Sequence, residues 1–126
     1  MILRHWTAHM RLELIRRDGA ILPTESNISP VQVHAGPDVV WLLPPDADPG
    51  SGAGHGLHEG KRTGWIDVDV PGIKWTDWAF TSAMPHSWRE TFINAGGGPD
   101  MADLWYVFPG PILARRWVRM SDGWRA

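Results

Sequence analysis

Glycine and proline recur throughout this chain and limit the length of its regular elements. The 126 residues include 14 glycines and 11 prolines. Glycine weakens the interior of helices and strands, and proline removes a backbone N–H donor, so both residues favour turns and loops. We therefore expect short strands and helices joined by frequent loops.

The remaining composition excludes several classes of protein. The chain has nine tryptophans, each of which buries a large area and needs a partner for its indole N–H. It has no cysteine, which excludes a disulfide scaffold and thiolate chemistry. A net charge of −2 at pH 7 argues against non-specific binding to duplex nucleic acid. At this length we expect a single domain over residues 1–126.

No segment has the character of a membrane span or a secretion signal. A spanning helix needs an apolar run of about 18 residues, and the chain has none. The N-terminus also lacks the apolar core of a signal peptide. We expect a cytoplasmic protein with no membrane partner.

Hydrophobic patterning predicts an α+β fold, in which a mostly antiparallel sheet carries two or three short helices. The expected strands are residues 2–7, 31–33, 38–43, 62–70, 104–108 and 112–120, and the expected helices are 8–17, a short one around Trp75 and Trp78, and 87–95. The last two strands flank a Pro-Gly-Pro turn, so we expect them to pair with each other. Residues 46–60 form a glycine-rich loop that we expect to be flexible.

The first strand presents an imidazole beside a hydroxyl. His5 and Thr7 are two residues apart, so their side chains point to the same face of the strand, and Trp6 points to the other. This pair is suited to holding a ribose. Thr7 is also placed to cap the following helix through its hydroxyl, and Gly19 suits the C-terminal cap of that helix.

The opening of the chain resembles the ADP-ribosyltransferase-like superfamily, which includes DarT-type toxins and tRNA 2'-phosphotransferases. The resemblance covers roughly the first twenty-five residues: a strand with His-aromatic-Thr, a helix, then Arg17-Asp18-Gly19-Ala20-Ile21-Leu22-Pro23. A group of small actinobacterial and actinophage proteins is more similar still. They share pieces like Val40-Trp41-Leu42, Lys61-Arg62-Thr63 and Leu104-Trp105-Tyr106-Val107.

This resemblance implies an ADP-ribosyltransferase-like fold, NAD as the substrate, and a set of residues that contact it. In that set His5 and Thr7 hold the ribose, Gly19 lies beside them, Trp41 stacks on the base or nicotinamide, and Arg62 binds the phosphates. A late acid stabilises the positive charge that develops on the ribose; we assign this role to Glu90, with Asp100 and Asp103 as the alternatives. The similar small proteins carry an acid a few residues beyond Glu90, where this chain has Ile93-Asn94.

Each of these residues also has a purely structural interpretation. His5 can be a half-buried histidine bonded to a neighbouring strand, and Trp41 can be part of the core. Arg62 and Glu90 can be solvated charges at a strand end and on a helix surface. The sequence leaves these alternatives open.

The segment His55-Gly-Leu-His58-Glu59 invites a metal-site interpretation, but its surroundings argue against one. Glycines at 52, 54, 56 and 60 disfavour the helix that would bring both imidazoles to one face. A catalytic zinc also needs a third protein ligand, which only His34, His86 or distant acids could supply. We expect no metal.

Three functions are compatible with the sequence. The first is an enzyme of the ADP-ribosyltransferase type, of the kind found in toxins and in phage or host-defence factors, whose acceptor is nucleic acid or a host protein. A basic patch at Arg115, Arg116 and Arg119 favours a nucleic-acid acceptor. The second is a module that binds a nucleotide or a protein without turnover, for example an anti-defence protein. The third is an interaction domain in which His5 and Thr7 only cap and pack.

Overall fold

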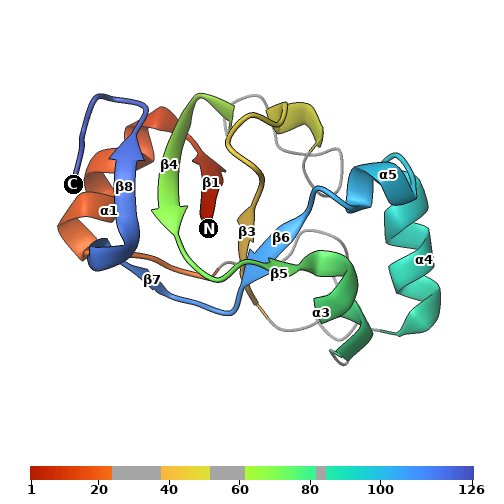
Figure 1. Cartoon of the computed structure of the whole chain (residues 1–126). Helices are drawn as coiled ribbons and strands as arrows, with labels where there is room; N and C mark the ends of the chain where they lie inside the picture. Colours follow the sequence, from red (N-terminus) through yellow and green to blue (C-terminus); the bar gives the residue numbers. More distant parts are fainter. Residues whose placement is uncertain (24–37, 52–61, 82–84) are drawn as a thin grey trace.

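The computed structural model describes residues 1–23, 38–51, 62–81 and 85–126 (Figure 1). The strands are β1 (Ile2–Thr7), β2 (Ala20–Ile21), β3 (Val40–Leu42), β4 (Gly64–Asp69), β5 (Ile73–Lys74), β6 (Tyr106–Phe108), β7 (Ile112–Leu113) and β8 (Trp117–Met120). The α-helices are α1 (Leu12–Asp18), α3 (Trp75–Thr81), α4 (His86–Ala95) and α5 (Pro99–Ala102). Three short 3-10 helices are η1 (His9–Arg11), η2 (Pro49–Ser51) and η5 (Ala114–Arg116).

The described strands pair antiparallel throughout. They form two three-stranded sheets, ordered β1-β4-β8 and β3-β6-β5, and a two-stranded sheet of β2 and β7. Arg4 and Leu43 join the two larger sheets by reciprocal backbone hydrogen bonds of 2.7 and 2.9 Å. The prediction of an α+β fold with a mostly antiparallel sheet and short helices is confirmed, whereas the ADP-ribosyltransferase-like detail stays a prediction.

Two apolar clusters stabilise the fold, one at each end of the molecule. The first packs α1 against β1, β4 and β8 through residues such as Leu3, Leu12 and Ile66, all at most 2% exposed. The second is aromatic and packs α3, α4 and α5 against β3 and β6 around Trp75 and Trp105, which are fully buried. Figure 1 shows α1 at one end and the other three helices at the opposite end.

The segment after β1 differs from the expected helix over residues 8–17. The chain first makes the 3-10 turn η1, and α1 follows from Leu12 to Asp18. Thr7 does not cap either element, because neither N-terminus has a side-chain cap and Thr7 belongs to β1. The His9 N–H donates instead to Oγ1 of Thr63, at 2.8 Å. Gly19 does end α1 as predicted, with φ +75° and its N–H on the Ile15 carbonyl at 2.9 Å.

The predicted hairpin of residues 104–108 and 112–120 is wrong. β6 pairs with β3 on one side and β5 on the other, β7 pairs with β2, and β8 pairs with β4. The Pro-Gly-Pro segment and η5 therefore carry the chain from one sheet to another. The hydrophobic pattern predicts which residues face inward but does not specify the neighbouring strand.

The predicted strand at 31–33, the two histidines of the metal interpretation and residues 52–60 of the glycine-rich loop lie outside the described residues. The described part of that loop ends in η2, where the Asp48 carboxylate accepts from the Gly50 N–H at 2.7 Å. In the part of the chain that the structure describes, no helix is long and apolar enough to cross a membrane.

Candidate functional site

β1 holds His5 between two strands and fixes one of its ring nitrogens. Nδ1 of His5 lies 3.0 Å from the backbone carbonyl oxygen of Trp41. A carbonyl can only accept, so Nδ1 carries the proton, and Nε2 of the neutral ring is an acceptor. Burial lowers the pKa of His5; the Trp41 carbonyl opposes this shift, and the positive charge of Arg11 adds to it. The imidazole is therefore held neutral at pH 7, while the residue as a whole is only half-buried.

Thr7 shares the face of β1 that carries His5, as the alternation predicts. In the antiparallel pairing with β4, His5 lies opposite Ile66 and Thr7 lies opposite Gly64. The backbone of His9 covers Gly64 so closely that a Cβ there would lie 2.9 Å from the His9 Cα. Thr7 is buried at 7% exposure beneath this turn. The structure thus brings His5 and Thr7 together but encloses the threonine.

Trp41 meets His5 through its backbone rather than its ring. The ring stacks on Trp75 with a centroid distance of 6.3 Å and contacts the edge of Phe92 at 6.2 Å. These rings belong to the aromatic cluster, whereas Leu3, on the His5 face of β1, belongs to the first cluster. The indole of Trp41 therefore belongs to the aromatic cluster, whereas its backbone carbonyl contacts the imidazole of His5.

Arg62 lies two residues before β4 and not inside the strand. Its side chain approaches η2, where Nη1 would lie 3.5 Å from a Cβ placed on Gly50. Among the residues that the structure describes, its buried Nε has no hydrogen-bond partner. Gly19 has a defined structural role, because its carbonyl accepts from the Ala114 N–H at 3.0 Å and so joins α1 to η5.

Glu90 is not brought to His5. It is exposed on α4, a helix that contributes Phe92 to the aromatic cluster. In Figure 1, β3 and β6 separate α4 from β1. The described geometry therefore places the proposed acid and the proposed ribose contact on separate parts of the molecule.

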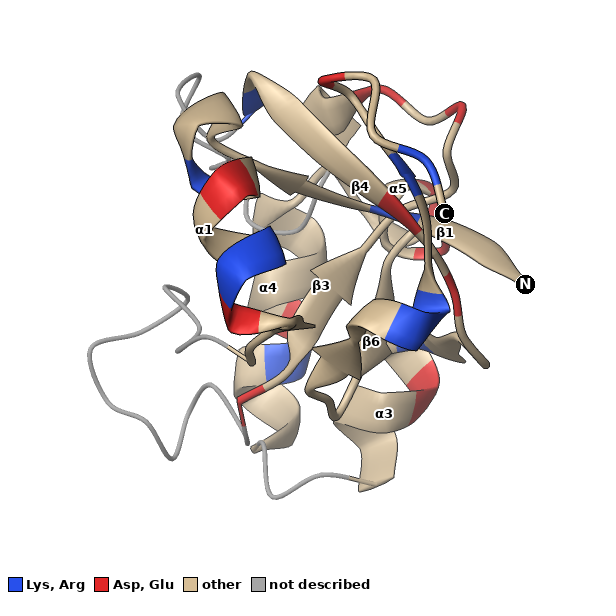
Figure 2. Ribbon diagram, turned by 90° about the vertical axis from the view of Figure 1, so that its left-hand side faces the viewer, with Lys and Arg blue, Asp and Glu red and all other residues tan. Residues whose placement is uncertain are grey.

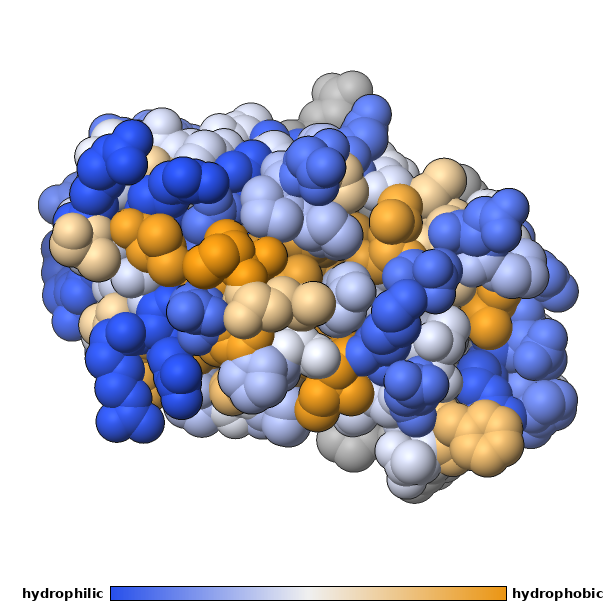
Figure 3. Space-filling view, viewed as in Figure 1, coloured by the Kyte–Doolittle hydropathy of each residue, from blue (hydrophilic) through white to orange (hydrophobic). Residues whose placement is uncertain are grey.

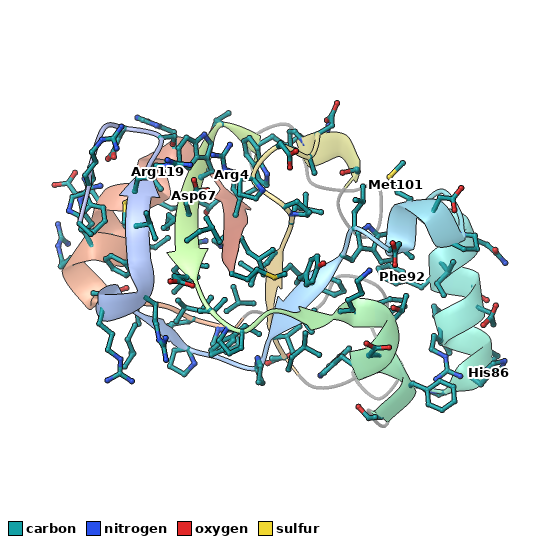
Figure 4. All side chains as sticks on the ribbon, viewed as in Figure 1. Arg4, Asp67, His86, Phe92, Met101 and Arg119 are labelled. Carbon is teal, nitrogen blue, oxygen red and sulfur yellow. The ribbon has the colours of Figure 1, made fainter. Side chains whose placement is uncertain are left out.

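The sequence interpretation missed a buried carboxylate. Asp67 is fully buried in the middle of β4 and accepts three hydrogen bonds: from Arg4 Nε at 2.7 Å, from Arg4 Nη2 at 3.0 Å and from Arg119 Nε at 2.7 Å. Figure 4 shows these three side chains together across the upper part of the β1-β4-β8 sheet. The Arg4 guanidinium also lies 3.6 Å from the centroid of the Trp65 ring. An acidic residue between Ile66 and Val68 of the predicted strand 62–70 was the available signal.

The expected basic patch is divided. Arg119, on β8, is hydrogen-bonded to Asp67, whereas Arg115 and Arg116 are exposed on η5. Figure 2 shows that basic and acidic segments are interspersed along the ribbon, on α1 as well as near the C-terminus. The charge distribution does not single out a nucleic-acid surface.

Among the described residues, no group of three or more His, Asp or Glu side chains could hold a metal ion. Comparisons of the chain with protein-family models, with curated proteins and with solved structures give no match.

Proposed function

We propose that this protein is an ADP-ribosyltransferase-like domain that binds NAD or a related nucleotide through its ribose, with His5 as the central contact. The observation that carries this proposal is the fixed, neutral state of His5. Its Nδ1–H is engaged by the Trp41 carbonyl, and its pKa is lowered, mainly by burial. Nε2 is therefore a defined acceptor on a residue that is only partly buried as a whole, and such an acceptor suits a ribose hydroxyl.

The neighbouring residues support binding of an anionic nucleotide. Arg11 is close enough to lower the pKa of His5, so it contributes positive charge beside the ring. Arg62 offers a guanidinium whose Nε has no partner among the described residues, and such a group suits a pyrophosphate. In this proposal Thr7 lies buried on the same face of β1 as His5, and Trp41 contributes through the carbonyl that orients the imidazole.

One observation favours the second candidate function, binding without turnover. A transferase that breaks an N-glycosidic bond uses a carboxylate near the ribose. Glu90 is exposed on α4, with β3 and β6 between that helix and β1. A module that binds and sequesters a nucleotide needs no such acid, and it would use the same His5 contact.

Ligand titration tests the shared part of both functions. The nine tryptophans make intrinsic fluorescence the readout, with NAD and ADP-ribose as the ligands. One lost hydrogen bond to His5 corresponds to about three- to tenfold weaker binding in a His5→Gln variant. His9→Gln is the matched control, because His9 is an exposed histidine in the adjoining η1. The proposal fails if neither ligand changes the fluorescence, or if His5→Gln and His9→Gln bind equally well.

Release of nicotinamide from NAD separates the two functions. Turnover that is lost in Glu90→Ala while NAD binding is retained would establish the enzyme. NAD binding without any release of nicotinamide by the wild-type protein would establish the binding module. Addition of a nucleic acid or a protein acceptor to the same assay identifies the acceptor class.

A further inference from the structure

A row of arginines crosses the sheet on the face opposite His5. Arg4 on β1 lies directly opposite Asp67 on β4, and Asp67 lies directly opposite Arg119 on β8. Arg119 is in turn the bridge partner of Arg125 in the C-terminal segment. Directly opposed residues project to the same face of an antiparallel sheet, with Cβ atoms about 5 Å apart. Three guanidinium groups and one carboxylate therefore share one line across the strands.

The charges in this row do not cancel. Asp67 supplies one negative charge against three positive ones, which leaves a surplus of two. Two further acids lie nearby in the sequence, but each already has a cation. Asp69 is 2.9 Å from the N-terminal ammonium group, and Asp122 is 2.6 Å from Nη1 of Arg16.

The opposed pair of Arg119 and Arg125 is the centre of this surplus. Like charges directly opposite each other on neighbouring strands destabilise a sheet. Within the described part of the chain, Arg125 has no carboxylate partner, and Arg119 donates only its Nε to Asp67. Arg119 therefore keeps both terminal nitrogens for a ligand. Its side chain is 42% exposed, and Arg125 is exposed as well.

Asp67 holds Arg119, one member of this pair, in a preformed position. The carboxylate is fully buried and is held on its other side by two hydrogen bonds from Arg4, whose side chain is only 14% exposed. Arg4 itself is stacked on Trp65. The guanidinium of Arg119 is thus anchored from within the sheet, and a preorganised donor loses less freedom when it binds. Figure 3 shows hydrophilic residues over the upper part of β8 and β4, where Figure 4 labels Arg119 and Asp67, so this part of the surface is polar.

We propose that Arg119 and Arg125 form a binding site for a phosphate group, with Asp67 and Arg4 as positioning residues. A phosphate dianion matches the surplus of two positive charges, and its oxygens accept the paired N–H groups of guanidinium. The site is separate from the proposed ribose site, because Arg4 and His5 are consecutive residues of β1 and point to opposite faces. It would take the phosphate of a phosphomonoester or a free phosphate ion.

The probe for this site is inorganic phosphate at constant ionic strength, with sodium chloride as the replaced salt. The readout is the thermal midpoint of the full-length chain across a phosphate titration, which gives an apparent Kd. Arg125→Gln removes the unpartnered guanidinium without touching the Asp67 bonds, and it is expected to weaken phosphate binding by about tenfold or more. Arg115→Gln is the matched control, because it removes an exposed arginine from η5 and leaves the row intact.

The proposal is upheld if phosphate stabilises the wild type and Arg115→Gln alike but stabilises Arg125→Gln much less. It is overturned if phosphate has no more effect than chloride on the wild type, or if the two variants respond identically. A second arm replaces phosphate with glycerol 3-phosphate, a phosphomonoester without a ribose, at equal concentration. Tighter binding of the ester identifies a phosphomonoester as the ligand, and equal binding identifies the free ion. Because inorganic phosphate lacks a ribose, this result stands independently of NAD binding at His5.

Discussion

Replacing Asp67 by asparagine should be among the more damaging single changes in the β1-β4-β8 sheet. The substitution keeps the shape of the side chain but removes the charge that two guanidinium groups share. Asparagine has one acceptor oxygen and an NH₂ group, so it would direct a donor at a guanidinium donor. Asp67 is fully buried, so water cannot replace the lost bonds.

The magnitude follows from the exposure of each partner. The two bonds from Arg4 lie in a part-buried setting, with the Arg4 side chain 14% exposed, and together they contribute about 2–3 kcal/mol. The bond from Arg119 is solvent-screened and contributes about 0.5 kcal/mol. We therefore expect Asp67→Asn to lower the free energy of unfolding by about 3 kcal/mol, which for a domain of this size is about 10 °C in Tm.

Urea denaturation followed by tryptophan fluorescence and circular dichroism measures this loss. Asp69→Asn is the control, because Asp69 lies two residues along the same strand and its side chain is 62% exposed in its pair with the N-terminal ammonium. The control should lose less than about 0.5 kcal/mol. Arg119→Gln should lose about as little, because Arg4 still neutralises Asp67. If Asp67→Asn lies within about 1 kcal/mol of Asp69→Asn, the inference that the buried charge holds the sheet together is refuted.

Three further predictions concern packing and pH. Gly96→Ala should destabilise the protein by about 2 kcal/mol or more in urea denaturation, because the new Cβ would lie 2.3 Å from the fully buried ring of Trp105. Gly50→Ala is the control, and its loss of stability should be much smaller because the new Cβ would meet only the Asp48 side chain, at 3.1 Å. The lowered pKa of His5 means that the unfolded chain binds a proton more readily, so stability should fall as pH drops from 7.5 through 6.5, and His5→Gln should lack this fall. Burial alone would raise the pKa of Asp122, but the hydrogen bond from its arginine partner and further interactions lower it overall, so its contribution should be present above about pH 4 and disappear below it. Parallel denaturation of Asp122→Asn across pH 2.5–6 should show a shallower acid loss, and equal slopes would contradict this assignment.

Local patterns predicted much of the secondary structure correctly. Alternation located β1 and β4, and the alternating residues Ile66, Val68 and Val70 are all buried. Helical spacing located α3 and α4, and Gly19 ends α1 in the left-handed conformation that glycine favours. These features depend on residues close together in the chain, which is why one sequence was enough to find them.

The partners of the strands could not be predicted in the same way. A Pro-Gly-Pro turn between two apolar segments is typical of a hairpin, yet β6 and β8 join different sheets. The deciding contacts are long-range ones: β6 lies between β3 and β5, and β8 borders β4 with a register shift at Asp67 and Val68. Register of this kind is determined by the packing of whole faces and leaves no local signal.

In the candidate site, too, local patterns predicted some features, while others depend on long-range contacts. The sequence indicated that His5 and Thr7 share a face, and the pairing of β1 with β4 is consistent with this. It could not indicate that the Trp41 carbonyl, 36 residues away, would fix the imidazole, because that bond depends on how β1 and β3 meet. Nor could it identify Asp67 as buried, since an acid between apolar residues of a strand usually faces solvent. Its burial depends on the arginines directly opposite it on both neighbouring strands.

Arg4 contributes to both the ribose site at His5 and the phosphate site at Arg119, through different parts of the residue. Its backbone pairs with Leu43 and so sets the register that brings the Trp41 carbonyl to His5, whereas its side chain reaches Asp67 on the other face. If the backbone pairing alone maintains this register, loss of the Asp67 charge should lower stability without changing NAD affinity in the folded protein. Titration of Asp67→Asn well below its Tm tests this separation. A parallel loss of NAD affinity would mean that the ion pairs also hold β1 in register, and the phosphate site and the ribose site would then be thermodynamically coupled.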